Sequence, residues 1–163
     1  PEIMAELDRE MKQRTESDTG AEAPAIFFVA HNLQKHKKLR AEDDFDFSFD
    51  EDAGGNPGAQ FNEIIAEGSA LGIHVIAVVD SYNNVMRCLS RKALSEFEMR
   101  VLFQMSANDS ASLIDSPKAS GLGMHRALFY NEHEGHLETF RPYALPPLGW
   151  VEEVKVKLAR GIF

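Results

Sequence analysis

The sequence contains few of the features that a secreted or membrane-bound protein needs. It has one cysteine, Cys88, so no internal disulfide can form and no Cys-x-x-Cys pair is available for zinc. The longest apolar runs, such as IHVIAVV at 73–79, are far shorter than the roughly 20 residues that span a bilayer. No charged and then apolar leader opens the chain. We therefore expect a reducing, cytoplasmic setting.

Basic residues are also scarce, with 17 Lys and Arg against 26 Asp and Glu and a formal net charge of -9. Such a surface repels phosphates, which argues against a free-standing nucleic-acid binder unless the basic side chains gather on one face. The pattern G-x-x-x-x-G-K-[ST] is absent as well. The chain by itself therefore lacks the glycine-rich loop that holds nucleotide phosphates in one large class of enzymes.

The residues that are present suit one globular domain over 1–163. The chain is 44% hydrophobic and 26% charged, which are ordinary proportions for a protein with one buried core. It starts at Pro1 and stops after VEEVKVKLARGIF without a turn or cap signal. We therefore expect an excerpt of a longer polypeptide.

Apolar periodicity predicts alternating helices and strands. Residues 25–30 and 73–79 are strand-length runs that are apolar on both faces, which is typical of parallel sheets covered on both sides. His74 and Cys88 are expected to be core residues. Other strands are expected at 99–105 and in a hairpin of 125–130 with 136–142, and helices at 2–14, 57–70, 91–97, 109–114 and 148–163. This order predicts an α/β fold, with a mostly parallel sheet flanked by helices and a C-terminal antiparallel hairpin.

Residues 35–56 differ in composition and form an expected insertion. A basic patch (Lys35, His36, Lys37, Lys38 and Arg40) precedes DDFDFSFDED at 43–52, where phenylalanines alternate with acids. One interpretation is a solvated insertion whose phenylalanines pack onto the body of the domain. The other is a short edge strand that docks a protein partner. We call residues 43–52 the acidic–aromatic strip.

Candidate site residues follow the predicted strands, because ligands of α/β sheets bind at the carboxyl ends of the strands. The places to examine are 30–32, 80–84 and 105–109. We expect Asn32, Asp80 and Ser106 to converge on one rim. A competing metal site in the turn EHEGH at 132–136, serving a hydrolase built on His125, His133 and His136, has no strand-end acid to support it.

Two segments carry a family resemblance. EGSALGIHVIAVVDS at 67–81 and MRVLFQMSANDSASLIDSPKASGLGMHRALF at 99–129 resemble the second half of the FtsK/SpoIIIE-type motor domain, a RecA-like P-loop ATPase. The resemblance extends over about 25–142. It implies ATP and Mg²⁺ as cofactors, double-stranded DNA as a partner, and assembly of the parent protein into a ring, possibly a hexamer. It also allows for a parent that is tethered to a membrane.

The resemblance assigns roles to several residues of this chain. His31 and Asn32 take the place of the Walker B acids, and Asp80 stands where a polar sensor faces the γ-phosphate. Arg100 begins the third strand and is a candidate catalytic residue. Arg87, Arg91 and Arg100 are candidates for the basic residue by which one subunit completes the site of its neighbour. Nucleotide-binding positions fall at Ser81, Ser106 and Asp109.

Two positions depart from the family pattern. The acids are missing at His31 and Asn32, and an acid at Asp80 repels a γ-phosphate unless a metal or protonation intervenes. The resemblance therefore suggests part of a DNA-translocase motor with weakened catalytic positions. The alternative is a catalytically inactive RecA-like module that recruits a protein partner.

Overall fold

The structure, a computed structural model, describes residues 1–17, 23–40 and 56–161. Two compact units divide the chain, Pro1–Glu98 (unit 1) and Met99–Phe163 (unit 2). Most of the predicted insertion at 35–56, including the acidic–aromatic strip, lies outside the described residues.

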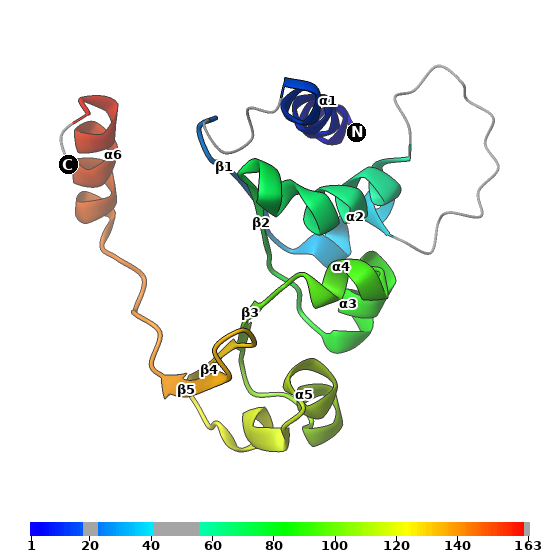
Figure 1. The fold of residues 1–163 in the computed structure, drawn as a ribbon. Helices are drawn as coiled ribbons and strands as arrows, with labels where there is room; N and C mark the ends of the chain where they lie inside the picture. The colour runs from blue at the N-terminus through cyan, green and yellow to red at the C-terminus, as the bar shows by residue number, and fades with distance from the viewer. Residues whose placement is uncertain (18–22, 41–55, 162–163) are drawn as a thin grey trace. The chain divides into compact units, whose positions relative to one another are not determined.

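Unit 1 contains a two-stranded parallel sheet (Figure 1). Strands β1 and β2 pair in register from Ile26 opposite Ile73 to Ala30 opposite Ala77. The elements of this unit are α1 (Glu2–Ser17), β1 (Ile26–Ala30), the 3-10 helices η1 (Leu33–Lys35) and η2 (Lys37–Leu39), α2 (Pro57–Glu67), the 3-10 helix η4 (Gly68–Leu71), β2 (Ile73–Ala77), α3 (Tyr82–Cys88) and α4 (Arg91–Ser95).

Helix α2 begins where the sequence predicts it to begin. The Asn56 side chain accepts hydrogen bonds from the backbone amides of Gly58 and Ala59, and Pro57 occupies the first turn. These are the N-cap and first-turn preferences of helices. The segment ends at Gly72, whose positive φ of 73° suits glycine, and the chain then enters β2.

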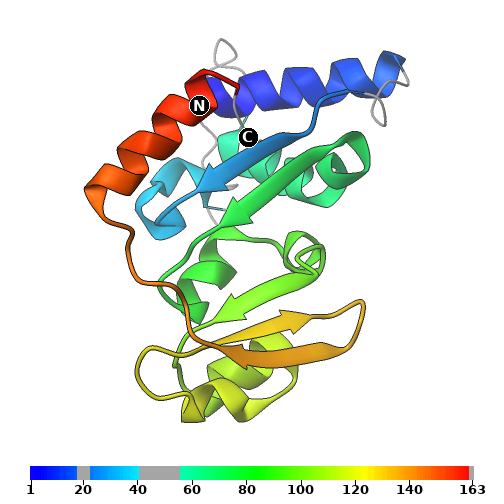
Figure 2. The same cartoon turned by 90° about the vertical axis from the view of Figure 1, so that its left-hand side faces the viewer.

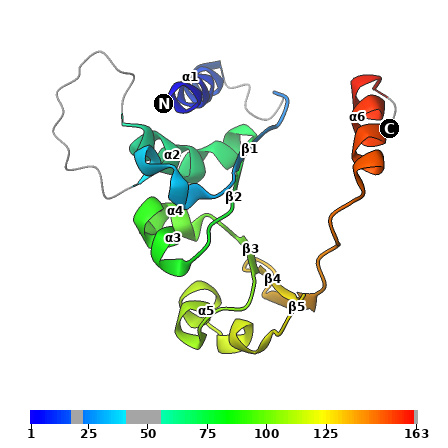
Figure 3. The ribbon, with the colours of Figure 1, turned by 180° about the vertical axis from the view of Figure 1, so that it is seen from behind.

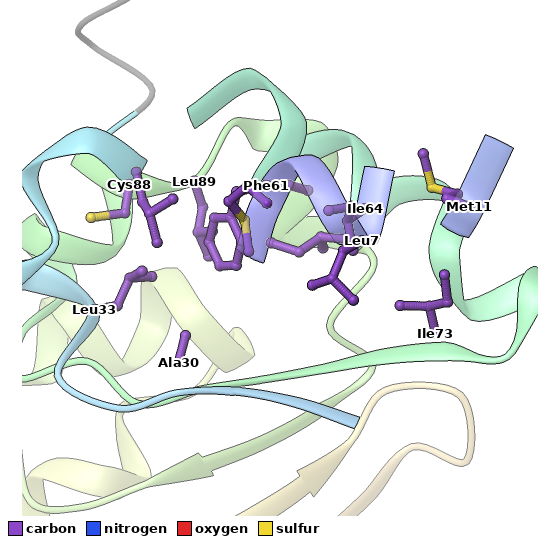
Figure 4. Close-up of a cluster of buried hydrophobic side chains, with 13 residues drawn as sticks. Leu7, Met11, Ala30, Leu33, Phe61, Ile64, Ile73, Cys88 and Leu89 are labelled. Atoms are coloured by element: carbon purple, nitrogen blue, oxygen red, sulfur yellow. The ribbon is translucent and has the colours of Figure 1, made fainter. Parts of the chain in front are cut away.

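One face of the sheet packs against α1 and α2. Ala30 and Ile73 lie under Leu7 and Phe61, and Phe61 is fully buried (Figure 4). Phe28, which points to the same face, meets Phe61 edge to face with 6.2 Å between ring centroids. The core of unit 1 is therefore a helix layer on one side of the sheet.

A buried arginine fixes α1 to this core. The Arg14 guanidinium donates to the carbonyl oxygens of Leu71 at 2.8 Å and Pro24 at 3.0 Å, and pairs with Glu10 at 2.7 Å. The two carbonyls lie just before β1 and just before β2. These hydrogen bonds therefore fix the position of α1 along the sheet.

The opposite face of the sheet is exposed, and we call it the bare face (Phe27, Val29, His74, Ile76 and Val78). Phe27 is 64% exposed and Val29 57% exposed, while the His74 ring stacks on Phe27 at 5.1 Å. Figure 2 views β1 and β2 from the side that α1 and α2 leave free. Two expectations are therefore wrong for this chain: unit 1 covers one face of the sheet and not both, and half-buried His74 lies on the bare face rather than in the core.

Unit 2 contains a three-stranded antiparallel sheet in the order β3-β4-β5. Leu102, Ile114 and Leu128 are buried in the core of unit 2, together with Ala119 and Leu122. Figure 3 shows α5 lying beside this sheet. The elements are β3 (Met99–Leu102), α5 (Ala107–Ile114), the 3-10 helix η5 (Pro117–Gly121), β4 (Ala127–Asn131), β5 (His136–Phe140) and α6 (Leu148–Ala159). The predicted hairpin is confirmed, as β4 paired with β5.

The pairing of β3 corrects one detail of the predicted sheet. The strand was expected to extend the parallel sheet, but it pairs antiparallel with β4, from Met99 opposite Asn131 to Leu102 opposite Leu128. Apolar alternation specifies which residues of a strand face a core and does not specify the direction of its partner.

Helix α6 contributes no buried residue. Leu148, Trp150 and Leu158 are all more than half exposed. Within the described residues, no helix combines the length and the apolar character needed to cross a membrane.

Candidate functional site

The carboxyl ends of β1 and β2 meet at one edge of the parallel sheet, as predicted. The Val78 amide donates to the Ala30 carbonyl, and the Leu33 amide donates to the Val78 carbonyl, both at 2.9 Å. These bonds continue the pairing past both strands and bring the two following turns together. We call the four residues of these turns, His31, Asn32, Asp80 and Ser81, the β1–β2 rim.

Asn32 forms the turn at the end of β1. Its backbone is left-handed, with φ 55° and ψ 51°, a conformation that asparagine adopts more readily than most residues. Its side-chain amide lies 3.0 Å from the His31 ring nitrogen Nδ1. The next residue, Leu33, is fully buried and anchors the turn. The half-buried amide and exposed imidazole are thus held at the rim, and neither side chain carries a carboxylate.

Asp80 is the acid of the rim, and its environment keeps it ionised. Its Oδ1 accepts hydrogen bonds from Asn84 Nδ2 at 2.7 Å and from Ser81 Oγ at 3.0 Å. The Asn84 bond, with help from Ser81, lowers the pKa of Asp80 below the ordinary aspartate value. Protonation therefore does not neutralise Asp80 at physiological pH. A phosphate beside this carboxylate needs a metal ion or a basic side chain to offset the repulsion.

The rim does not fit a complete Mg²⁺–nucleotide site. Magnesium bound to a nucleotide is usually held by one or two carboxylates together with the phosphates, and the phosphates are cradled by a glycine-rich loop. The rim supplies one carboxylate, and the sequence has no such loop. In the described part of the chain, no three His, Cys, Asp or Glu side chains are placed to bind a metal ion together.

The predicted site residues of unit 2 serve local structure. Ser106 caps α5, with its Oγ accepting from the Asp109 amide at 3.1 Å. Arg100 donates to the Leu113 carbonyl and pairs with Glu132 at 2.8 Å, so it joins the end of α5 to the hairpin turn. The convergence of Ser106 with Asn32 and Asp80, and the catalytic and nucleotide-binding roles of Arg100 and Asp109, stay predictions.

The structure gives a role to Asn84, which lies in the segment 80–84 but was assigned none from the sequence: it supports Asp80 of the rim. Asn84 lies one helical turn after Asp80, and the Asp-x-x-x-Asn spacing at a helix start was its only signal. Cys88, predicted to be structural, is buried in the core of unit 1. In the turn at 132–136, His136 approaches only the exposed Glu138 carboxylate, at 3.3 Å, among the contacts that the structure defines for its ring nitrogens.

These observations confirm the predicted fold class. The chain is an α/β protein with a small parallel sheet, a three-stranded antiparallel sheet and flanking helices, which is the predicted RecA-like α/β architecture in part. The carboxyl ends of the parallel strands meet where such a fold binds its ligand.

A solved structure supports this assignment. The fold is similar to the cytoplasmic domain of the Type VII secretion ATPase EccC from Thermomonospora curvata, with a TM-score of 0.61 and 17% sequence identity. The match covers 90% of this chain and 17% of the EccC chain, so the present chain spans about a sixth of that protein. At this level of sequence identity, the similarity shows the fold. No family model matches the sequence, and no curated protein matches it.

Proposed function

We propose that this chain is the second half of an FtsK/SpoIIIE-like ATPase core whose phosphate-binding loop is supplied by another segment. The observation that carries the proposal is the fold similarity to a secretion ATPase over 90% of the chain. The β1–β2 rim lies at the strand ends where such a core binds its nucleotide. The chain contributes the rim and its supporting helices, and the missing half contributes the phosphate cradle.

The rim residues then have separate roles. His31 and Asn32 stand at the Walker B positions without negative charge, so Mg²⁺ is held more weakly than in an active ATPase. Asp80 stands at the γ-phosphate sensor position and is ionised. This arrangement disfavours ATP over ADP when no cation bridges the carboxylate and the γ-phosphate.

The bare face supports the same proposal. Parallel sheets are almost always covered on both faces. The bare face exposes four apolar side chains, those of Phe27, Val29, Ile76 and Val78. The remaining part of an ATPase core would cover this face by packing against it. The parent protein then works in the cytoplasm as a ring assembly that moves a polymer, and double-stranded DNA is the cargo that the resemblance favours.

A second candidate function is a catalytically inactive RecA-like module that recruits a protein partner. The neutral side chains at His31 and Asn32 favour it, because a nucleotide site without Walker B acids loses most of its hydrolytic machinery. The two candidates differ in turnover and not in fold.

Nucleotide titration tests the proposal. The proteins to compare are this chain and the longest polypeptide that its gene encodes, each with ATP and ADP, with and without Mg²⁺. We expect saturable binding only when a phosphate-binding loop is present. Asp80→Asn should then strengthen ATP binding without Mg²⁺ by about 5- to 10-fold, since the repulsion between the carboxylate and the γ-phosphate is removed.

Glu96→Gln is the matched control, since Glu96 is an exposed carboxylate of unit 1 away from the rim. An unchanged ATP affinity in Asp80→Asn, or no nucleotide binding by the longer polypeptide, contradicts the proposal. Turnover stimulated by duplex DNA supports the translocase, and nucleotide binding without turnover supports the inactive module.

A further inference from the structure

A groove of about 530 Å³ lies beside β1 in unit 1. Its walls come from the start of α1, from β1 and from η1 and η2. Three consecutive β1 residues, Phe28, Val29 and Ala30, contribute to it. Because successive strand residues point to opposite faces, a groove that touches all three follows the edge of the strand.

This edge of β1 has free backbone groups. The Ile26 amide donates to the Gly72 carbonyl, and the Ala30 carbonyl accepts from the Val78 amide, so the backbone groups of residues 26, 28 and 30 face β2. Those of Phe27 and Val29 therefore face away from β2. In the described ranges β1 pairs with β2 alone. Such an edge accepts an added strand from another polypeptide.

The groove has an apolar floor and a basic rim. Ile3, Met4 and Leu39 are among its apolar lining residues, and the exposed side chains of Lys35, Lys37 and Lys38 also line it. Among the residues that the structure covers, no carboxylate lies within salt-bridge distance of these three lysines. The groove thus has the chemistry to bind an extended peptide that carries acids beside large apolar side chains.

The chain itself contains a segment of this chemistry. The acidic–aromatic strip at 43–52 alternates Phe45, Phe47 and Phe49 with acids, and it lies outside the described residues, so only its sequence enters here. In an added strand, this alternation directs phenylalanines to one side and Asp44, Asp46 and Ser48 to the other. We propose that the groove of one copy binds the acidic–aromatic strip of a second copy.

The contact joins two different surfaces, the groove of one copy and the strip of the next. A heterologous contact of this kind builds rings or open chains of subunits. Nucleic acid is a poorer occupant, because a phosphate backbone has no apolar groups to fill the floor. The proposal goes beyond the nucleotide chemistry of the rim and is testable without ATP.

A labelled peptide with the sequence of residues 43–52 tests the contact by fluorescence anisotropy. We expect saturable binding that weakens as salt rises. The charge-reversal variant Lys35→Glu, Lys37→Glu, Lys38→Glu should lose at least 10-fold in affinity. The control variant Lys118→Glu, Arg126→Glu, Lys157→Glu has the same net charge and alters exposed residues of unit 2, so it should bind as the parent chain does. Circular dichroism melting verifies that both variants fold.

Sedimentation over a range of concentrations tests the second copy. The chain should self-associate, and the variant Phe45→Ser, Phe47→Ser, Phe49→Ser should stay monomeric. The proposal is overturned if the chain is monomeric at every concentration and the peptide binds only the Phe45→Ser, Phe47→Ser, Phe49→Ser variant. That result would mean that the strip of each copy occupies the groove of the same copy. Equal peptide binding by both charge variants overturns the proposal as well, as does displacement of the peptide by duplex DNA at lower concentration than by unlabelled peptide.

Discussion

Asp80 carries the negative charge of the rim, and this charge determines whether the rim attracts or repels a phosphate. Two hydrogen-bond donors, Asn84 and Ser81, point at one of its carboxylate oxygens. Both favour the charged form, so the pKa of Asp80 falls below the ordinary aspartate value. The proposed sensor role calls for a neutral polar side chain, whereas Asp80 carries a fixed negative charge. The charge is stabilised by the neighbouring helix α3, which makes it a feature of the local structure.

Replacing the main donor should reverse this shift. In Asn84→Ala, the carboxylate keeps only the Ser81 bond, so the pKa of Asp80 should rise toward its ordinary value. NMR titration of the side-chain carboxyl carbon measures it directly. A carboxylate whose pKa is lower in the folded than in the unfolded state stabilises the native state at pH values above the unfolded pKa. This stabilisation is lost as the pH falls through the folded pKa. In the parent chain, this small contribution therefore disappears only on the acid side of the ordinary aspartate pKa.

Asn83→Ala is the control for this titration, because Asn83 is exposed and belongs to the same helix. It should leave the Asp80 titration where it is in the parent chain. Identical Asp80 curves in the parent and Asn84→Ala would show that the 2.7 Å bond does not set the ionisation.

Single residues were predictable where one local rule applies. Asn32 and Asp80 share a rim because both follow parallel strands, which the apolar runs before them indicate. His74 was misplaced, because a histidine in an apolar strand looks the same in sequence whether its face is covered or bare. The partner of Arg100 was unpredictable, because Glu132 lies far along the chain in the hairpin turn.

At the scale of elements, capping and apolar periodicity predicted most helices and strands. Helix α2 starts at its Asn-Pro signal, β1, β2 and β5 fall within the predicted ranges, and β4 ends one residue beyond its range, at Asn131. Helix α3 was missed, because YNNVMRC has neither a capping side-chain bond nor a clear apolar stripe. Its position follows from tertiary contacts, with Cys88 buried against the core of unit 1.

Two glycines in helices give an opposed pair of predictions. A Cβ on Gly58 in α2 would lie 2.7 Å from the Arg40 carbonyl oxygen, whereas a Cβ on Gly149 in α6 meets nothing within 4 Å. Alanine normally stabilises a helix by up to ~1 kcal/mol relative to glycine. We expect Gly58→Ala to destabilise unit 1 by about 1–3 kcal/mol through backbone displacement, and Gly149→Ala to be neutral or slightly stabilising.

Urea unfolding followed by circular dichroism measures both variants. Gly58→Ala should lower the unfolding midpoint, and Gly149→Ala should not lower it. If Gly58→Ala stabilises the chain, then the segments that hold Arg40 and α2 together move apart at little energetic cost, and the close approach at the start of α2 is not a constraint.

At the scale of the molecule, the sequence and the structure disagree about one surface in an informative way. β1 and β2 are apolar on both faces, which is the pattern of a sheet inside a larger α/β core. Unit 1 supplies helices for one face only, and the bare face keeps its apolar side chains exposed. The α/β class was therefore predictable from the chain, but the environment of its sheet was not. The proposed function accounts for the difference, because the other half of an ATPase core would pack against the bare face.

The bare face should bind an apolar dye, and this property should depend on its own side chains. Contiguous exposed apolar surface is uncommon on soluble proteins and attracts dyes such as ANS. In Phe27→Ser, Ile76→Thr, dye fluorescence should fall by at least half, while stability changes by less than about 1 kcal/mol because both side chains are exposed. The control Met99→Thr, Met124→Ser removes exposed apolar side chains from unit 2 and should keep most of the signal.

The longest polypeptide that the gene encodes should bind little dye at this face, since its other half covers it. Strong dye binding by that polypeptide, reduced by the Phe27 and Ile76 changes, would show that the face stays open and would remove its support for the proposed ATPase core.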